Sequence, residues 1–276
     1  MRGHLLVDVP LVALALAAYP ALGWMAPVAA GGLSAMIHTW GVINPRSSLY
    51  MPVCWRLGPD AGGCALTYDD GPNPEVTPRL LDCLSETRSQ ATFFLIGSHV
   101  RREGALVRRI RAEGHALGLH SDTHSRLFNC WGPARVRADL EACGTAISQA
   151  TGEPPPRLFR PPVGLKNPMV GWVSTRMGLS TVTWTARGRD IHARSAAPVL
   201  ARLEPHLRAG SILLLHDGHE PTRAGERGIC LEVTRSLTAR MHQLGLVSRG
   251  LTCAGTSTSV SLLRDAPAPG THPASA

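Results

Sequence analysis

Apolar residues dominate the first 45 positions of this chain, and further along they alternate with polar residues. The run from Val9 to Ile37 carries no charged residue and is rich in Leu, Ala and Val. Roughly 20 apolar residues span a bilayer, so the run is long enough for one tilted membrane helix. Pro20, Pro27 and Gly31-Gly32 could instead break it into a short helical hairpin.

A cleaved signal peptide is the alternative interpretation of this run. Val28-Ala29-Ala30, before Gly31, resembles a small-residue cleavage site. We favour a retained membrane anchor, because the apolar stretch is long for a signal peptide and its N-terminal flank is weakly basic. Arg2, Arg46 and Arg56 lie on both flanks, so the distribution of charge does not orient the segment.

From Cys64 onward, short apolar runs rich in β-branched residues alternate with longer amphipathic ones. The predicted strands cover residues 64–68, 91–96, 115–119, 157–160, 181–185, 211–215 and 246–251. The predicted helices cover residues 77–88, 100–113, 133–150, 167–177, 196–208 and 229–243. This alternation predicts an α/β fold with a parallel sheet or barrel, and seven strands indicate a barrel one unit short of the eightfold type.

The pattern divides the chain into three parts. Residues 1–45 form the apolar membrane segment, and residues 46–253 form the α/β domain. Residues 254–276 are rich in Ser, Thr, Ala and Pro and predict a flexible tail.

Polar residues that could take part in catalysis or metal binding follow the ends of the predicted strands. They are Asp69, Asp70, His120, His124, Arg160, Asp190 and His216. The carboxyl ends of the strands form the active-site face of α/β barrels, so we expect these side chains to converge.

Two adjacent carboxylates and two histidines indicate a metal site. Asp69 and Asp70 cannot both be charged in a partly buried turn without a compensating cation. His120 and His124 are an i, i+4 pair, which suits shared metal ligation. With one carboxylate, three ligands would leave positions open for water and substrate. Solvated acids in an Asp-Gly-Pro turn and two ordinary loop histidines are the alternatives.

The other candidates have weaker individual signals. Arg160 opens a rigid Arg-Pro-Pro-Val-Gly turn and could orient a carboxylate, or lie on the surface. His216 ends an apolar strand and could transfer protons near neutral pH, or be structural. Asp190 could pair with His216, or form a salt bridge with Arg187 or Arg189.

The net charge is +8, yet Lys166 is the only lysine, so the basicity comes from scattered arginines. We therefore expect no nucleic-acid partner, although a basic face near an anionic bilayer remains an alternative. A single lysine argues against Schiff-base chemistry, and no GxxxxGKS/T or GxGxxG segment supports nucleotide binding.

The seven cysteines have no CxxC spacing, which argues against a zinc knuckle. Cys54 with Cys64, or Cys230 with Cys253, could form a disulfide in an extracytoplasmic domain, but buried thiols are the state we favour for most. Histidines without a partner pattern, which we expect to be structural or without a role, are His99, His115, His192, His206 and His219.

Five sequence segments, in their order along the chain, resemble motifs of the polysaccharide deacetylase family. This family is carbohydrate esterase family 4 and has the NodB homology domain. Chitooligosaccharide deacetylases belong to it. The resemblance runs from about residue 64 to 252. The segments that carry it are Thr67–Pro72, Ala91–Gly97, His120–His124, Arg160–Gly164 and Leu213–His216.

The resemblance implies a deformed (β/α)7 barrel and assigns roles to the candidates. Asp70, His120 and His124 would bind one divalent ion, most often zinc, with cobalt, nickel or manganese as alternatives. In the catalytic set, Asp69 would be the general base, held by Arg160. His216 would be the general acid, with Asp190 as its candidate partner. The expected substrate contacts are Pro162, Val163 and Trp184, with the Val163 backbone N–H at the oxyanion; Trp184 could instead simply pack.

Some positions depart from the family pattern. Leu119 stands where Asn is usual, Val163 replaces a frequent aromatic residue, and the segment from Trp184 to Asp190 only approximates the fourth motif. None of these departures removes a metal ligand or a proton-transfer residue.

The main functional hypothesis is a membrane-anchored, metal-dependent hydrolase that removes N-acetyl groups from a glycan. Peptidoglycan, a chitin-like oligomer and another surface polysaccharide are candidate substrates, and we expect an extracytoplasmic catalytic domain. One alternative is a deacylase or deformylase of a lipid-linked amino sugar. The other is an inactive carbohydrate-binding protein on the same fold, which the intact set of acidic and histidine residues argues against.

Overall fold

The computed structural model describes residues 2–219, 228–253 and 259–263. The α-helices are α1 (Arg2–Leu22), α2 (Met25–Ile43), α3 (Thr77–Glu86), α4 (Gly97–Arg102), α5 (Gly104–Ala112), α6 (Pro133–Thr151), α7 (Pro168–Arg176), α8 (Ala197–Leu203) and α9 (Gly228–Gln243). The strands are β1 (Val53–Cys54), β2 (Ala65–Gly71), β3 (Ala91–Leu95), β4 (Ala116–Leu119), β5 (Leu158–Phe159), β6 (Ser180–Val182), β7 (Ala186–Arg187), β8 (Ile212–His216), β9 (Leu251–Cys253) and β10 (Val260–Leu262).

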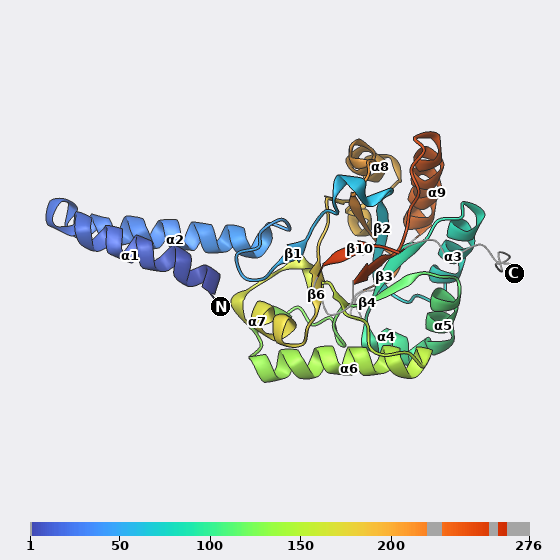
Figure 1. Ribbon diagram of the computed structural model, residues 1–276, viewed down its shortest axis with the longest axis horizontal. Coiled ribbons are helices and arrows are strands. Elements are labelled where there is room, and N and C mark those ends of the chain that lie inside the picture. Colours follow the sequence, from blue (N-terminus) through green and yellow to red (C-terminus); the bar gives the residue numbers. More distant parts are fainter. Residues whose placement is uncertain (1, 220–227, 254–258, 264–276) are drawn as a thin grey trace, which may run out of the picture.

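Eight parallel strands form one curled sheet in the order β1-β6-β5-β4-β3-β2-β8-β7, with helices arranged around it (Figure 1). Every residue of β2, β3 and β8 is buried. Strands covered on both faces read as continuous apolar runs, which explains why the sequence pattern located them. The predicted deformed barrel is confirmed.

The strand count differs from the prediction. β1 and β7 have two residues each. The hydrophobic pattern did not predict them, because two residues are too few to show a strand's periodicity. The predicted strand at 246–251 is wrong as a member of the barrel, because β9 pairs antiparallel with β10 in a separate two-stranded sheet. β10 lies within the predicted flexible tail, and residues 254–258 and 264–276 of that tail lie outside the described residues.

The helix predictions differ in two places. The segment predicted as one helix over 100–113 is two helices, α4 and α5, separated at Glu103. The segment predicted over 196–208 ends as an α-helix at Leu203 and continues as a short 3-10 turn.

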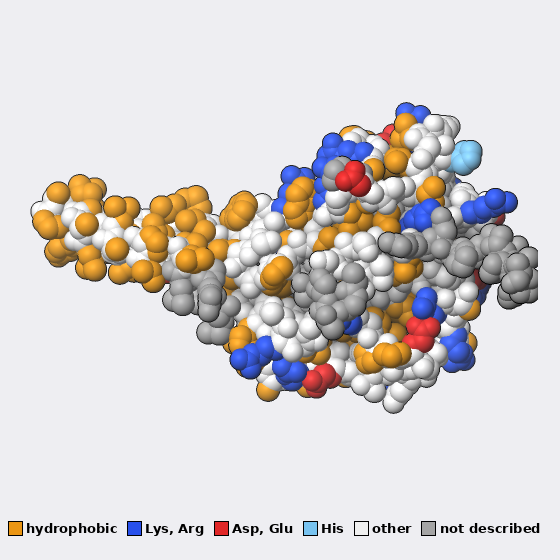
Figure 2. Space-filling model, in the orientation of Figure 1, with side chains coloured by type: hydrophobic (Ala, Val, Ile, Leu, Met, Phe, Trp, Pro, Cys, Tyr) orange, Lys and Arg blue, Asp and Glu red, His pale blue; other side chains and the backbone are white. Residues whose placement is uncertain are grey.

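The apolar N-terminus is a helical hairpin, which is one of the two arrangements that the sequence left open. The chain reverses at Gly23, which has a positive φ of 58°, rather than at the proline and glycine positions favoured by the sequence. Pro10 and Pro20 lie inside α1. α2 is long and apolar enough to cross a bilayer by length and composition. The hairpin projects from the barrel and its surface is almost entirely hydrophobic (Figures 1 and 2).

Polar contacts join the two helices where the hairpin meets the barrel. Ser34 Oγ donates to Asp8 Oδ1 at 2.6 Å, and His38 Nε2 lies 3.0 Å from the same oxygen. His38 Nδ1 lies 2.7 Å from the Tyr50 hydroxyl. Pairing a carboxylate with these donors offsets the cost of placing it in an apolar segment.

The single lysine connects the hairpin to the barrel. Lys166 is buried, and its Nζ donates to the carbonyl of Asn44, which follows α2, at 2.6 Å. Its backbone N–H donates to Val42, and Thr183 Oγ1 donates to the carbonyl of Pro45 at 2.7 Å. A cation at a helix C-terminus also interacts favourably with the helix dipole. Burial lowers the pKa of Lys166 to about 8.

All seven cysteines, each within the described residues, are free thiols. Cys64, Cys83, Cys143 and Cys230 are buried, as expected for structural thiols. Neither disulfide that the sequence left open is formed.

We expect Lys166→Met to loosen the base of the hairpin, because the buried Asn44 carbonyl loses its donor at a cost of roughly 1–3 kcal/mol. Limited proteolysis of the detergent-solubilised full chain should cut faster within residues 44–50. The exposed Arg208→Met is the matched control. Equal cleavage rates for Lys166→Met and wild type would contradict this role.

Candidate active site

Two consecutive carboxylates enter the same cavity because β2 is irregular at its end. Side chains of a regular strand alternate between faces, but the register of β2 with β3 shifts between Asp69 and Gly71. Asp70 there has a left-handed φ of 70°. Both Asp69 and Asp70 are buried and line one pocket. The strained backbone is therefore what delivers both acids to one face.

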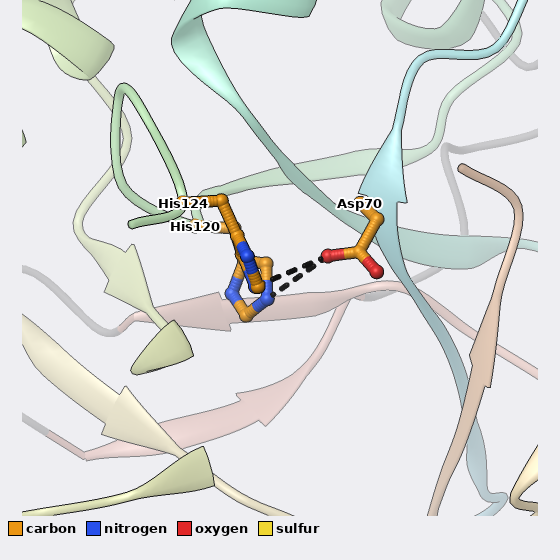
Figure 3. A group of neighbouring side chains, drawn as sticks. All are labelled: Asp70, His120 and His124. Atoms are coloured by element: carbon orange, nitrogen blue, oxygen red, sulfur yellow. Dashed lines mark ion pairs between the residues drawn. The ribbon is translucent and has the colours of Figure 1, made fainter. Parts of the chain in front are cut away.

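Asp70, His120 and His124 form a buried cluster whose candidate ligand atoms all lie within 4.8 Å of one another. Figure 3 shows Asp70 projecting from β2 toward both imidazoles, with Asp70 Oδ1 3.4 Å from each Nε2. That oxygen is buried and receives no hydrogen bond. An orphaned buried carboxylate oxygen facing two imidazole nitrogens fits a divalent cation, and N2O donor sets suit zinc.

The charge state of Asp70 agrees with this fit. Burial by itself disfavours its ionised form, but the adjacent His120 imidazole and the positive charge on His216, His120 and His124 hold the pKa of Asp70 below its ordinary value. Asp70 is therefore an anion that is ready to bind a cation.

The histidine ligands are oriented by groups outside the cluster. His120 Nδ1 lies 2.8 Å from the carbonyl of Arg160, so Nδ1 carries the proton and Nε2 is left facing Asp70. The loop that carries His124 is held by Asp139 of α6, which accepts from Ser121 Oγ at 2.6 Å and from Thr123 Oγ1 at 2.9 Å. Ser121 Oγ in turn accepts from the His124 backbone N–H at 3.1 Å.

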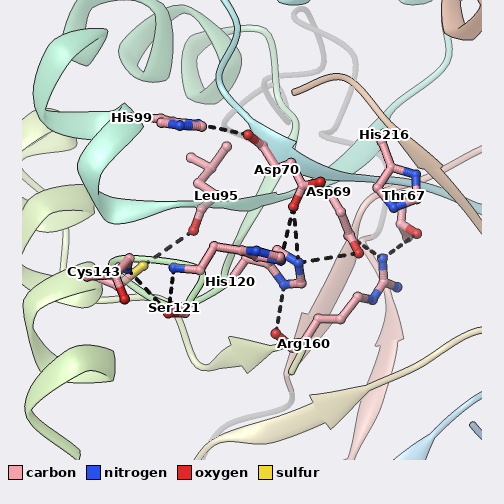
Figure 4. Close-up of polar contacts among 12 residues, drawn as sticks. Thr67, Asp69, Asp70, Leu95, His99, His120, Ser121, Cys143, Arg160 and His216 are labelled. Carbon is pink, nitrogen blue, oxygen red and sulfur yellow. Dashed lines mark hydrogen bonds and ion pairs between the residues drawn. The ribbon is translucent and has the colours of Figure 1, made fainter. Parts of the chain in front are cut away.

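Asp69 is held by a fully buried arginine (Figure 4). Arg160 NH1 donates to Asp69 Oδ1 at 2.7 Å and to Thr67 Oγ1 at 2.9 Å. NH2 donates to the carbonyl of Thr183 at 3.0 Å, and the guanidinium lies 4.1 Å from the centroid of the Phe94 ring. Asp69 Oδ2 lies 3.7 Å from His120 Nε2. Arg160 therefore fixes one Asp69 oxygen and leaves the other beside the cluster.

His216 lies directly beside Asp69, because β2 and β8 pair with Asp69 opposite His216. His216 Nδ1 lies 2.9 Å from Asp190 Oδ1, and its backbone N–H donates to Asp190 Oδ2 at 2.8 Å. Among the residues the structure describes, Asp190 pairs with His216 and not with Arg187 or Arg189. Burial opposes protonation of His216, but the charge and hydrogen bond of Asp190, and then Asp70 and Asp69, raise its pKa.

These groups surround a cavity of about 460 Å³. Val163, in a left-handed conformation with φ 60°, and Trp184 line it. Trp184 also packs against Gly164, so it has both roles that the sequence left open. Pro162 does not line the cavity, because it is buried in the 3-10 turn Pro162–Gly164.

The sequence analysis missed several residues around the site. Arg126, Arg187 and His192 line the cavity, although His192 had been taken as structural. His99, also taken as structural, lies with Nδ1 2.9 Å from the carbonyl of Asp70. Asp139 supports the histidine loop from a helix 18 positions after Ser121. A charged residue on an amphipathic helix or beside a strand has no distinctive spacing, so only the three-dimensional contacts identify these residues.

The comparisons with known proteins agree with the geometry. The model of the polysaccharide deacetylase family matches residues 58–182. A chitooligosaccharide deacetylase of Sinorhizobium fredii is 36% identical over 207 residues, which cover 73% of this chain and 96% of that protein. A peptidoglycan-N-acetylglucosamine deacetylase of Bacillus cereus is 33% identical over 168 residues, which cover 60% of this chain and 78% of that protein.

The same relationship is visible in solved structures. A family 4 carbohydrate esterase from Streptomyces lividans, solved in complex with acetate, superposes with a TM-score of 0.64 at 27% identity, covering 74% of this chain and 98% of that one. This chain belongs to the polysaccharide deacetylase family. It is a hydrolase of the deacetylase type.

We expect Asp139→Asn to weaken metal binding about 10–100-fold, because the amide cannot accept all the hydrogen bonds that hold the loop of His124. Chelator competition with zinc on the full chain measures this. Glu141→Gln, an exposed change on the same helix, is the control and should bind as wild type does. Unchanged zinc affinity in Asp139→Asn would remove the supporting role of Asp139.

Proposed function

We propose that this protein is a membrane-anchored, metal-dependent enzyme that hydrolyses the N-acetyl group of amino sugars in a glycan. The observation that carries the proposal is one cavity in which an Asp-His-His cluster lies between a second carboxylate and a carboxylate-bound histidine. Relatives that act on chitooligosaccharides and on peptidoglycan N-acetylglucosamine support a glycan substrate.

Asp70, His120 and His124 would hold the metal, and zinc is the ion we propose, with cobalt, nickel or manganese as alternatives. A divalent cation held there supplies Lewis-acid polarisation of the acyl carbonyl and acidifies the attacking water. The three buried donors would supply three protein ligands to such an ion, which is the number that catalytic zinc sites use.

Asp69 is the proposed general base. Its second oxygen is beside the metal cluster, while Arg160 binds the first and fixes the direction of the carboxylate. Asp69 takes a proton from the water as the water oxygen bonds to the acyl carbon. Arg160 acts through Asp69 and is a positioning residue.

His216 is the proposed general acid. Its Nδ1 proton is held by Asp190, so Nε2 is the nitrogen that delivers a proton to the amide nitrogen as the C–N bond breaks. The products are acetate and a free amino sugar. We assign the backbone N–H of Val163 to the oxyanion and Trp184 to the sugar face, because both residues line the cavity. Asp190 is a positioning residue that also keeps His216 protonated.

The hairpin α1–α2 is the proposed membrane anchor, and we infer an extracytoplasmic catalytic domain over residues 46–253. From Leu6 onward its exposed surface is largely apolar, including Trp24 at the turn and Trp40 near the base. A free hairpin of this composition would be insoluble, so bilayer insertion is the state that its surface favours.

Removing the metal should abolish amine release from N-acetylated chitooligosaccharides, and zinc or cobalt should restore it. Asp70→Ala should lose bound metal and activity together. Asp69→Asn should retain metal but lose turnover about 10²–10⁴-fold, because only the base is removed. Metal analysis and amine release on the same samples separate the two effects. Near wild-type turnover in Asp69→Asn would overturn the base assignment.

Asp190→Asn should move the alkaline limb of the pH–rate profile to lower pH. The general acid must be protonated, so the rate falls as pH rises through the pKa of His216. Asp190 raises that pKa, and the amide would not. A kcat profile between pH 5 and pH 10 tests this, with exposed Asp82→Asn as the control. An unshifted alkaline limb would exclude His216 as the acid seen in the profile.

A further inference from the structure

Arg187 is a cation in the catalytic cavity that the deacetylation chemistry does not use. It ends β7, is half-buried, and lines the cavity beside Trp184 and His216, with its guanidinium 5.6 Å from the centroid of the Trp184 ring. Its Nε is buried and makes no hydrogen bond. No carboxylate among the described residues forms an ion pair with it.

The nearby carboxylates already have partners. Asp69 pairs with Arg160, Asp190 pairs with His216, and Asp70 faces the two metal-site histidines. A half-buried guanidinium without an anion is unfavourable, and a second guanidinium is close by. Burial lowers the pKa of Arg160, and the positive charge of Arg187 lowers it further.

The balance of charge in the cavity is therefore positive when a divalent cation is bound. Asp69 and Asp70 supply two negative charges. A divalent cation and Arg187 would supply more than two positive ones. A cavity of this charge favours a substrate that brings its own anion.

The cavity also lies against the base of the hairpin. Its wall at Val163, Gly164 and Leu165 is followed by Lys166, which is bonded through backbone and side chain to the end of α2. Exposed large apolar side chains among the described residues outside the hairpin include Leu127, Val163 and Met169. Leu127 adjoins Arg126, which lines the cavity, and Val163 lines it as well, so exposed apolar side chains lie at or next to the cavity.

An arginine without a carboxylate partner in the cavity wall matches a phosphate. Guanidinium groups bind phosphate through paired, charge-assisted hydrogen bonds. A sugar carried on a lipid phosphate would bring the anion to Arg187 while its acyl group reaches the metal cluster. A neutral polymer would leave the guanidinium without a counter-charge.

We propose, resting on the deacetylase function above, that the glycan is attached to a membrane lipid through phosphate at its N-acylated amino sugar, and that Arg187 binds this phosphate. Arg187 is then the residue that selects the substrate class. It does not take part in proton transfer.

The test compares the full chain reconstituted in phosphatidylcholine vesicles on three probes. They are polyprenyl diphosphate N-acetylglucosamine, the phosphate-free polyprenyl glycoside of N-acetylglucosamine, and soluble N-acetylglucosamine 1-phosphate. Amine release gives kcat/KM for wild type, Arg187→Gln and the exposed control Arg194→Gln. We expect wild type and Arg194→Gln to prefer the phosphate-linked lipid by about tenfold or more. Arg187→Gln should lose this preference, because its kcat/KM should fall about tenfold further on the phosphate-linked lipid than on the phosphate-free glycoside.

The outcomes separate this inference from the proposed function. A chitooligosaccharide assay run in parallel reports deacetylation itself, and no amine release from any probe would defeat the proposed function. Release without a phosphate preference, or an equal loss on both lipids in Arg187→Gln, would overturn the inference alone. If the soluble sugar phosphate is used as well as the lipid, the lipid part of the inference is wrong.

Discussion

Two adjacent carboxylates, buried at the end of a central strand, set the main constraint on this structure. Asp69 and Asp70 cannot both remain ionised in a low-dielectric cavity unless cations compensate each of them. Arg160 compensates Asp69 from a fully buried position, and the donor set around Asp70 fits a metal ion. This difference in compensation supports the proposed roles of the two side chains, Asp69 as proton acceptor and Asp70 as metal ligand.

The rest of the site depends on how this pair is held. The irregular end of β2 directs both acids into one cavity, and the register of β2 with β8 sets His216 directly beside Asp69. Support comes from outside the cavity, through Asp139 beneath the histidine loop and Asp190 behind His216. Rigid supporting contacts keep proton-transfer groups within reach of one reacting carbon.

The hairpin and the cavity form one continuous assembly. Lys166 follows the cavity wall in sequence and binds the end of α2. A displacement of the hairpin would therefore also displace the part of the wall that includes Val163. In the proposed membrane-anchored state, the hairpin would also set the height and orientation of the cavity relative to the bilayer surface.

Sequence alone determined the class of fold and the principal polar residues. Buried parallel strands are continuous apolar runs, and the acids and histidines at their ends, from Asp69 to His216, stand out against them. Tertiary structure decided what has no local signal. The reversal at Gly23, the two-residue strands β1 and β7, the choice of His216 as partner of Asp190, and the lone Arg187 in the cavity all depend on contacts between distant segments. Local periodicity reports which face of an element is buried, but not which distant group packs against that face.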